Sequence, residues 1–533
     1  MKERWRRLAQ RVRNHLPPVQ LVVLAGLGLT IRLGLAWVSI PTLIQKTVSD
    51  DSFYYFGIAR HIAIDGSVSI NGLTQTNGFH PLWLLLISPI YMLLENNLET
   101  PIHVALTIGA ILDVVTGLLA YRLTRLLTGS SAAGLVAATV YILNPTAVFN
   151  AINGMETSLN VLLIGLFLFV YAAIQNGGPT LRRYGLLGIV GGLMMLARSD
   201  NIFLLCTIYS HAAWTSMRKP GGKGLPISVL GTSCLFALWL LWNYYSFGTI
   251  VQTSATAIPY VRHEHFILHS GGSTARLLVE SFHWLFERHA WLIDASWTVL
   301  PPLTGLPLWV VVGFGSVKTV YDSKRRHQPV AGFALVGLLL LSCVALLLFH
   351  ALVRWFPRAW YFAPLSFGFA LLLGVLVAAG RKYPPAPLWK HRVIVTLAVS
   401  EVFLLVGGFW WSRGLYPWQL EMYEASLWLR ANTPASSRIG SFNSGLQAYY
   451  SDRTVINLDG VVNDAALKAV GQKRLLEYIQ EMRIRYIADY AASIHQDYAP
   501  FYGGEPQLEL LAVVDEPGVS WQRSVIHIYR LLE

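Results

Sequence analysis

The sequence is poor in charged residues. Only 13% of its 533 residues are Asp, Glu, Lys or Arg, whereas 54% are hydrophobic. Soluble globular domains carry about 25% charged residues. The hydrophobic residues gather in runs long enough for a helix to cross a bilayer, which takes about 20 residues. The shortage of charge therefore excludes an ordinary soluble protein and predicts a polytopic α-helical membrane protein.

Cysteine is scarce as well. The chain has three, Cys206, Cys234 and Cys343, and each lies inside an apolar run. Because they form neither a pair nor a metal-ligand spacing, a disulfide framework and a cysteine zinc site are excluded. The basic segment 1–18 is followed by no small-residue cleavage site. We therefore expect the next apolar run to be an uncleaved first transmembrane helix rather than a signal peptide.

Basic residues outnumber acidic ones, 41 to 29, which gives a formal net charge of +12. Most of this excess lies in short loops between apolar runs, where it sets the orientation of a membrane protein. The sequence has no basic stripe interleaved with aromatic residues. We therefore expect no nucleic-acid partner.

About eleven apolar stretches are candidate transmembrane helices. They are residues 18–40, 102–121, 131–149, 157–175, 184–198, 201–216, 225–245, 300–317, 330–350, 359–379 and 393–412. A further stretch, Pro81–Leu94, is short and contains Pro89. If it does not cross, the N-terminus and the basic loops all face the cytoplasm, whereas those loops flip outward if it does. The charge pattern therefore predicts a cytoplasmic N-terminus and an extracytoplasmic C-terminus.

The chain after residue 412 changes character. Helical stretches at Glu421–Ala431 and Ala465–Glu481 alternate there with short β-type runs at Arg438–Ser441, Thr454–Leu458, Tyr486–Ala488 and Ser524–Leu531. We therefore divide the chain into a transmembrane domain, 1–412, and a soluble extracytoplasmic α/β domain, 413–533. The predicted topology puts the loops 41–101 and 246–299 on the same side as that domain, and the second is long enough to cover a site.

Two adjacent carboxylates follow the first apolar run, in Asp50-Asp51-Ser52-Phe53-Tyr54-Tyr55. Such a pair suits cation binding or removal of a proton from a hydroxyl, because a like-charged neighbour raises the pKa of a carboxylate. A solvated pair of loop acids is the alternative. The aromatic neighbours, Tyr54 among them, favour a site.

Asn77 and His80 lie just before the short stretch that starts at Pro81. At headgroup depth they suit contact with a phosphate or a hydroxyl, while the neighbouring Phe and Trp suit an interfacial anchor. Glu156 stands at the predicted external mouth of a helix, where a lone carboxylate is costly unless it is paired or liganded. An N-terminal helix cap is the alternative for Glu156.

Arginines on the predicted outer side run against the overall charge pattern. Arg354 and Arg358 follow His350 at one membrane edge, and a guanidinium group matches the geometry of phosphate oxygens. A lipid phosphate is therefore their expected partner, and generic headgroup contact is the alternative. Arg198 and Asp200 share a tight external turn, where they either pair with each other or hold a sugar.

Taken together and in this order, these motifs resemble the GT-C superfamily of membrane glycosyltransferases. The superfamily includes protein O-mannosyltransferases, aminoarabinose transferases, arabinofuranosyltransferases and oligosaccharyltransferase subunits. The runs Trp428–Pro434 and Ile456–Gly460 also resemble the tails of bacterial members. The resemblance implies an inverting transfer from a polyprenyl-phosphate monosaccharide to a cell-envelope glycan, lipid or protein, outside a prokaryotic cytoplasmic membrane.

The resemblance also implies roles for single residues. Asp50 or Asp51 is the base that deprotonates the acceptor, and Asp50 is favoured as the first carboxylate of the motif. Glu156 positions the acceptor or joins both aspartates in holding a divalent cation (Mg²⁺, Mn²⁺ or Ca²⁺), a requirement that varies within the superfamily. Donor phosphate binding falls to Arg358, Arg354 and His80, and further site candidates are Tyr54, Asn77, Arg198, Asp200 and His350.

Two departures from the family pattern matter. Glu156 lacks a second acid two residues away, unlike the paired motif of oligosaccharyltransferases, which disfavours peptide glycosylation. His80 stands where aminoarabinose transferases carry lysine. The alternative functions are a lipid or polysaccharide transporter and a catalytically inactive GT-C scaffold. Against a transporter, the sequence has neither paired repeats nor Gly/Pro-broken helices near the midplane.

Overall fold

The computed structural model describes residues 18–94, 97–218, 224–270, 331–352, 358–380, 409, 414–515 and 525–532. The predicted span 300–317, Arg354, and all of the predicted span 393–412 except residue 409 lie outside these ranges. The prediction of about eleven crossings is therefore tested for the described part only.

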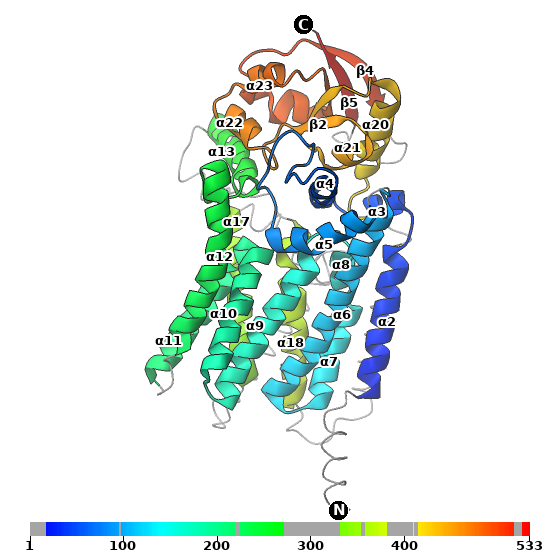
Figure 1. Ribbon diagram of the computed structural model, residues 1–533. Helices are drawn as coiled ribbons and strands as arrows, with labels where there is room; N and C mark the ends of the chain where they lie inside the picture. The colour runs from blue at the N-terminus through cyan, green and yellow to red at the C-terminus, as the bar shows by residue number, and fades with distance from the viewer. Residues whose placement is uncertain are drawn as a thin grey trace, which may run out of the picture.

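Helices running roughly side by side form the described membrane region (Figure 1). They are α2 (Val19–Ala36), α6 (Thr100–Thr128), α7 (Ser131–Leu143), α8 (Pro145–Ala151), α9 (Thr157–Gly177), α10 (Leu181–Ala197), α11 (Ile202–Arg218), α12 (Leu225–Phe247), α17 (Ala331–Leu352) and α18 (Ala363–Gly380). Within the described ranges, five helices are long and apolar enough to cross a bilayer: α2, α6, α9, α12 and most of α17. The fold is therefore that of a polytopic helical membrane protein.

The predicted span 131–149 is a bent pair of helices and not one straight helix. α7 ends at Leu143 and α8 begins at Pro145, with 59° between them. Pro145 has no N–H to donate into a continuing helix. The Asn144 side chain instead accepts a hydrogen bond from the Ala147 N–H at 2.9 Å, which caps the start of a new helix.

Arg32, inside α2, is fully buried. Its guanidinium donates hydrogen bonds to Asp113 of α6 at 2.5 and 2.9 Å, and to the carbonyls of Gly28 and Ile142 at 3.0 Å each. The Asp113 carboxylate also accepts from the Tyr141 hydroxyl at 2.6 Å. Because a lone charge inside a membrane is costly, this network gives Arg32 a structural role in joining α2 to α6 and α7.

Three short helices lie over the upper end of the bundle (Figure 1). They are α3 (Ile40–Lys46), α4 (Asp50–Ile64) and α5 (Pro81–Leu93). α5 has 13 residues and contains Pro89, so it is shorter than the roughly 20 residues that cross a bilayer. This length agrees with the prediction that 81–94 does not cross.

A five-stranded mixed sheet lies above these helices (Figure 1). Its strands are β1 (Arg438–Ser441), β2 (Thr454–Asn457), β3 (Tyr486–Tyr490), β4 (Leu508–Val514) and β5 (Ile526–Leu531), and the helices around it are α20 (Gln419–Asn432), α21 (Gly445–Tyr450), α22 (Asp464–Gly471) and α23 (Leu475–Glu481). The strand order is β2-β1-β3-β5-β4. β1 pairs in parallel with β2 and β3, whereas β5 pairs antiparallel with β3 and β4.

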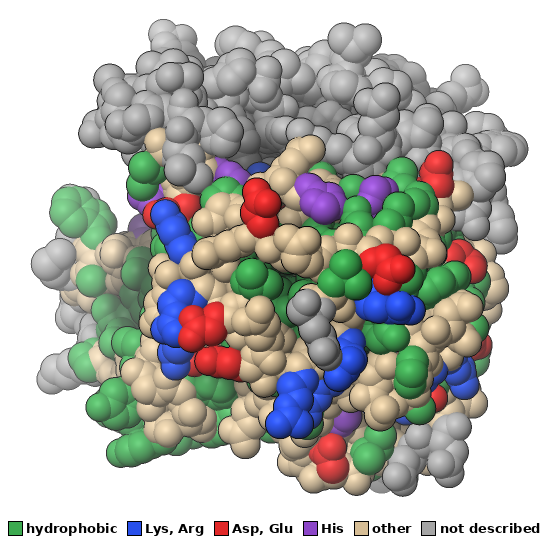
Figure 2. Space-filling view, turned by 90° about the horizontal axis from the view of Figure 1, so that it is seen from above, with side chains coloured by type: hydrophobic (Ala, Val, Ile, Leu, Met, Phe, Trp, Pro, Cys, Tyr) green, Lys and Arg blue, Asp and Glu red, His purple; other side chains and the backbone are tan. Residues whose placement is uncertain are grey.

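The strand predictions hold better than the helix predictions in this part. Four strands fall on the predicted β-type runs, while β4 was not predicted. The predicted helical stretch Ala465–Glu481 is two helices, because the chain turns between them at Lys473, whose φ is +55°. Seen from above, the surface of this part mixes acidic, basic and apolar side chains (Figure 2), as expected of a surface in water.

The described part of the predicted loop 246–299 rests on the C-terminal part. It contains η3 (Thr253–Ala255) and α13 (Ala257–Ser270). The Thr253 hydroxyl donates to the Val461 carbonyl at 2.9 Å, and a His265 ring nitrogen lies 2.5 Å from the Asp497 carbonyl oxygen. These contacts hold the segment in place beside the region below the sheet.

Candidate active site

A cavity of about 650 Å³ lies between the upper end of the membrane helices and the C-terminal part. One side, which we name the membrane wall, includes Asp51, Tyr54, Tyr55, His80, Met155, Glu156, Arg198, Asp200, His350, Arg358, Trp360 and Tyr361. The opposite side, the C-terminal wall, includes Trp418, Phe442, Asn443, Asp459, Val461, Ser493, Asp497 and Tyr498. Neither half of the molecule forms the cavity alone.

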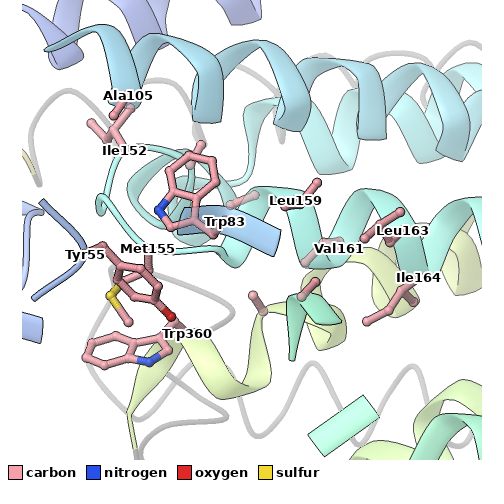
Figure 3. Packing of buried hydrophobic residues seen from close by; sticks show 14 of the residues in the cluster. Tyr55, Trp83, Ala105, Ile152, Met155, Leu159, Val161, Leu163, Ile164 and Trp360 are labelled. Carbon is pink, nitrogen blue, oxygen red and sulfur yellow. The ribbon is translucent and has the colours of Figure 1, made fainter. Parts of the chain in front are cut away.

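The apolar core ends at the membrane wall. Tyr55, Met155 and Trp360 lie close together there, and Trp83 and Ile152 lie above them in the view (Figure 3). The Trp83 ring N–H donates to the carbonyl of Gly154 at 3.0 Å, which fixes the loop before α9. The membrane wall is therefore a packed surface that holds its polar side chains in place.

Asp50 and Asp51 are the first two residues of α4, but their carboxylates face different surroundings. The Asp50 carboxylate accepts hydrogen bonds from the backbone N–H groups of Leu446 at 2.6 Å and Gly445 at 3.3 Å. Burial raises the pKa of Asp50 to about 7, although the bond from Leu446 opposes the rise. Asp50 does not line the cavity; it fastens α4 to α21.

Asp51 lines the cavity. Among the described residues, none donates a hydrogen bond to its carboxylate. Burial raises the pKa of Asp51; the positive charge of Arg358 opposes this rise and the negative charge of Glu156 adds to it. Asp51 therefore has the position and the raised proton affinity that a general base needs.

Glu156 is fully buried and paired. One of its oxygens accepts a hydrogen bond from Arg198 at 2.5 Å, and the other accepts from the Tyr55 hydroxyl at 2.8 Å. Glu156 occupies the N-cap position of α9, as the alternative interpretation predicted, but its side chain makes no capping bond. Arg198 also binds Asp200 at 2.6 Å, so the pairing expected within that turn is present.

His80 and Asn77 are separated by the structure. His80 lines the cavity with its ring nitrogen 4.0 Å from Glu156, and burial lowers the pKa of His80, against the opposing charge of Glu156. Asn77 is fully buried outside the cavity lining. Its amide nitrogen donates to Asn243 at 2.8 Å and its oxygen accepts from the Thr253 N–H at 3.1 Å, a structural role.

The edge of the membrane wall is aromatic and cationic. The His350 and Tyr361 rings stack with centroids 5.1 Å apart, and the Arg198 guanidinium lies 4.8 Å from the centroid of Tyr361. Arg358 lies 5.7 Å from the Trp360 ring centroid. Arg358 and His350 thus line the same cavity as Asp51 and His80. Arg354 lies outside the described residues.

The C-terminal wall contains a carboxylate for which the sequence suggested no role. Asp459 lines the cavity, and burial raises its pKa to about 8. Its neighbour Gly460 has a φ of +82°, and a side chain there would meet Leu467 at 2.7 Å. This turn places Asp459 over the cavity. The signal for it in the sequence is the Ile456–Gly460 run, which resembles the tails of bacterial GT-C members.

Comparison with known families and structures gives three kinds of result. A family model described as dolichyl-phosphate-mannose-protein mannosyltransferase matches residues 79–242, and one described as a domain of unknown function matches residues 413–525. None of the curated proteins compared with the chain matches it. Solved structures match over nearly the whole chain.

Two groups of solved structures are similar. The Archaeoglobus fulgidus oligosaccharyltransferase, in complex with Zn and sulfate, is 14% identical; the match covers 92% of this chain and 72% of that chain, with a TM-score of 0.58. The same organism's AglB was solved with an inhibitory peptide and a dolichol-phosphate, at 14% identity, 93% and 73% coverage and a TM-score of 0.53. ArnT from Cupriavidus metallidurans, bound to undecaprenyl phosphate, is 11% identical, with 96% and 97% coverage and a TM-score of 0.55.

The chain has the GT-C fold. The expected GT-C resemblance is thereby confirmed for the fold, over 96% of the chain.

The metal site expected of some GT-C proteins can be tested on the placed carboxylates. Among the described residues, no three His, Cys, Asp or Glu side chains gather closely enough to hold a metal ion. Asp50 is bound to backbone N–H groups and Glu156 to Arg198, so Asp51 is the member of the predicted trio whose carboxylate has no hydrogen-bond donor in the described chain. The three carboxylates, as placed, do not form the predicted cation site.

Proposed function

We propose that this GT-C chain is an inverting glycosyltransferase. It transfers a monosaccharide from a polyprenyl-phosphate donor to a hydroxyl of a glycan, lipid or protein on the extracytoplasmic face. The observation that carries the proposal is Asp51, a carboxylate in a cavity whose membrane edge holds Arg358 and His350. Solved structures with this fold bind dolichol-phosphate and undecaprenyl phosphate, which supports a lipid-phosphate donor.

Asp51 is the general base in this proposal, in place of Asp50. The Asp51 carboxylate lies in the cavity, whereas that of Asp50 accepts two backbone N–H groups of the C-terminal part. The acceptor hydroxyl gives its proton to Asp51 as its oxygen attacks the anomeric carbon. The bond from that carbon to the phosphate oxygen breaks on the opposite face, so the configuration inverts and polyprenyl phosphate leaves.

The leaving phosphate needs positive charge and hydrogen-bond donors close by, because negative charge develops on its oxygen as the bond breaks. We assign Arg358 to this role, with His350 and His80 as further donors. Arg198 is already paired with Glu156 and Asp200. We therefore propose that Arg198 and Glu156 hold the side chains of the membrane wall in position and do not bind the phosphate.

The membrane arrangement belongs to the same proposal. Residues 1–412 form the transmembrane domain with a cytoplasmic N-terminus, and 413–533 form an extracytoplasmic α/β domain. A lipid donor then reaches the membrane wall from the outer leaflet, because α11 and α17 contribute Ile202, Phe203, Phe349 and His350 to the cavity. The acceptor comes from the opposite side.

The deciding experiment measures consumption of polyprenyl-phosphate monosaccharides by the protein in lipid vesicles. We expect wild type to consume at least one donor of a panel, and Asp51→Asn to lose about 10²- to 10⁴-fold in turnover, the usual contribution of a general base. Asp50→Asn should lose far less, since an amide oxygen still accepts from the Leu446 N–H. Assays with and without divalent cation test whether turnover depends on one.

The control variant is Asp452→Asn, which lies in the C-terminal part at an exposed position away from the cavity lining. An Asp50→Asn loss as large as that of Asp51→Asn would contradict the assignment of the base. If no donor is consumed while lipid moves across the vesicle membrane, a transporter replaces the enzyme; if neither occurs, an inactive scaffold does.

A further inference from the structure

The C-terminal wall is one edge of the parallel part of the sheet. Asn443 follows β1, Asp459 follows β2 and Ser493 follows β3, and all three line the cavity. β1 pairs in parallel with both β2 and β3. Because the carboxyl ends of parallel strands meet at the same edge, these three loops come together there.

The strand order forms a crevice at this edge. β1 lies between β2 and β3, so the chain leaves β1 toward β2 on one side and later returns to β3 on the other. Such a reversal of strand order is the point at which open α/β sheets bind ligands, in the crevice outside the carboxyl ends of the strands. Here that crevice opens onto the cavity that contains Asp51.

The side chains at this edge are held in fixed positions. The Asn443 amide nitrogen donates to Asp489 at 2.9 Å, and Asp489 also accepts from the N–H groups of Phe442 and Asn443 at 2.7 and 2.8 Å. One N–H of the Asn443 amide is thus engaged, and the Asn443 side-chain oxygen is placed to accept a hydrogen bond. The Asp459 carboxylate is held by the Val461 N–H at 2.8 Å.

An aromatic platform lies beside these groups. The Tyr498 and Phe442 rings stack with centroids 4.1 Å apart and 17° between their planes, and both residues line the cavity. Carboxyl and amide oxygens accept from hydroxyl groups, while ring faces pack against the C–H face of a sugar. A peptide strand would instead add to a sheet edge, and the edges of this sheet are β2 and β4.

We propose that the C-terminal wall, built from Asp459, Asn443 and the Phe442–Tyr498 ring pair, is the acceptor subsite and that it binds a sugar. This inference rests on the proposed function and names the acceptor class as a glycan. The donor phosphate is assigned to Arg358 on the membrane wall, so the two substrates approach Asp51 from opposite sides. Arg262 of α13 borders the same cavity.

The experiment measures binding without transfer. Saturation-transfer-difference NMR is recorded on the full-length protein in lipid nanodiscs, with methyl mannopyranoside, methyl glucopyranoside and methyl arabinofuranoside as probes and N-acetyl-Ala-Thr-Ala-amide as the peptide probe. We expect at least one glycoside to give a saturable signal with wild type. Asp459→Asn and Asn443→Ala should each weaken its binding about tenfold or more, because each removes a hydrogen-bond acceptor from the subsite.

The matched control is Glu509→Gln, whose side chain is 47% exposed on β4 and should leave the signal unchanged. Thermal unfolding of each variant in detergent identifies any that fails to fold. A peptide signal that depends on Asp459, or glycoside binding that Asp459→Asn leaves unchanged, overturns the glycan subsite; so does the absence of any saturable glycoside signal. If the protein binds a glycoside through Asp459 but consumes no donor, the transferase function is contradicted and the sugar subsite is still supported.

Discussion

At the scale of single residues, neighbours in sequence have opposite surroundings. Asp50 and Asp51 are adjacent, yet the carboxylate of the first is bound by backbone N–H groups of Gly445 and Leu446, and that of the second lines the cavity. Successive residues of a helix point about 100° apart, since a turn takes 3.6 residues. One carboxylate can therefore join the two parts of the molecule while the other meets substrate.

The pH dependence of the reaction should report Asp51. Burial raises the pKa of Asp51, and the Arg358 charge opposes the rise. A base works only when deprotonated, so kcat/KM should increase with pH, with a midpoint above about 4, the ordinary carboxyl value. Arg358→Gln removes the opposing charge and should move this midpoint to higher pH. Initial rates of donor consumption across about pH 4 to 9 measure both effects.

The comparison for this shift is Arg430→Gln, an arginine exposed on α20 that should leave the midpoint where it is in wild type. The readout is the position of the midpoint and not the height of the curve, because Arg358 is also assigned to the donor. A midpoint that stays fixed or moves to lower pH in Arg358→Gln would count against Asp51 as the titrating group.

At the scale of elements, the segment before α5 is pressed against the turn that carries Asp459. A Cβ added to Gly78 would lie 2.0 Å from the Val461 carbonyl oxygen and 3.1 Å from the Thr253 hydroxyl. Since the first of these is a backbone atom, only glycine allows so close an approach. Gly78, which follows Asn77, thus sets the distance between the two walls of the cavity.

Gly78→Ala should push these elements apart. We expect a loss of about 1–3 kcal/mol in stability, the usual cost of overpacking, together with a loss of donor turnover, because the Asp459 turn shifts relative to Asp51. Thermal unfolding in detergent and the vesicle assay measure the two effects. Gly185→Ala is the control, since a Cβ there meets nothing within 4 Å. Equal behaviour of the two variants would show that the contact at Gly78 is not tight.

At the scale of the whole molecule, the cavity depends on how the C-terminal part is fastened to the helices. The buried Gln419 amide nitrogen donates to the carbonyls of Ile44 and Val48 at 2.8 Å each, and its oxygen accepts from the Asp50 N–H at 2.6 Å. These three bonds join α20 to α3, to the connection between α3 and α4, and to the first residue of α4. They fix the distance between the C-terminal wall and Asp51.

Gln419→Ala should loosen this junction. The variant leaves buried carbonyls and an N–H without partners, which costs about 1–3 kcal/mol for each group. We expect a lower thermal midpoint and faster limited proteolysis of the C-terminal part, with turnover reduced because the cavity opens. Gln480→Ala, at an exposed position on α23, is the control. Proteolysis at the wild-type rate would show that other contacts carry the junction.

The sequence by itself determined the membrane character, most helix positions, four strands and the set of motifs around the site. These features follow from local quantities: apolar run length, β-type runs and the charge pattern of loops. Asp51, His80, His350 and Arg358 were candidates because of the resemblance to GT-C motifs, and the structure gathers them in one cavity. The break at Pro145 was also readable from the residue type, although the predicted span ran through it.

Only the tertiary structure decided which of the predicted residues meet. It turned Asp50 toward α21, paired Glu156 with Arg198 and placed Asn77 outside the cavity. It also brought Asp459, about 400 residues along the chain from Asp51, to the opposite wall. Such contacts depend on the strand order of the sheet and on the packing of distant elements, which no local pattern encodes.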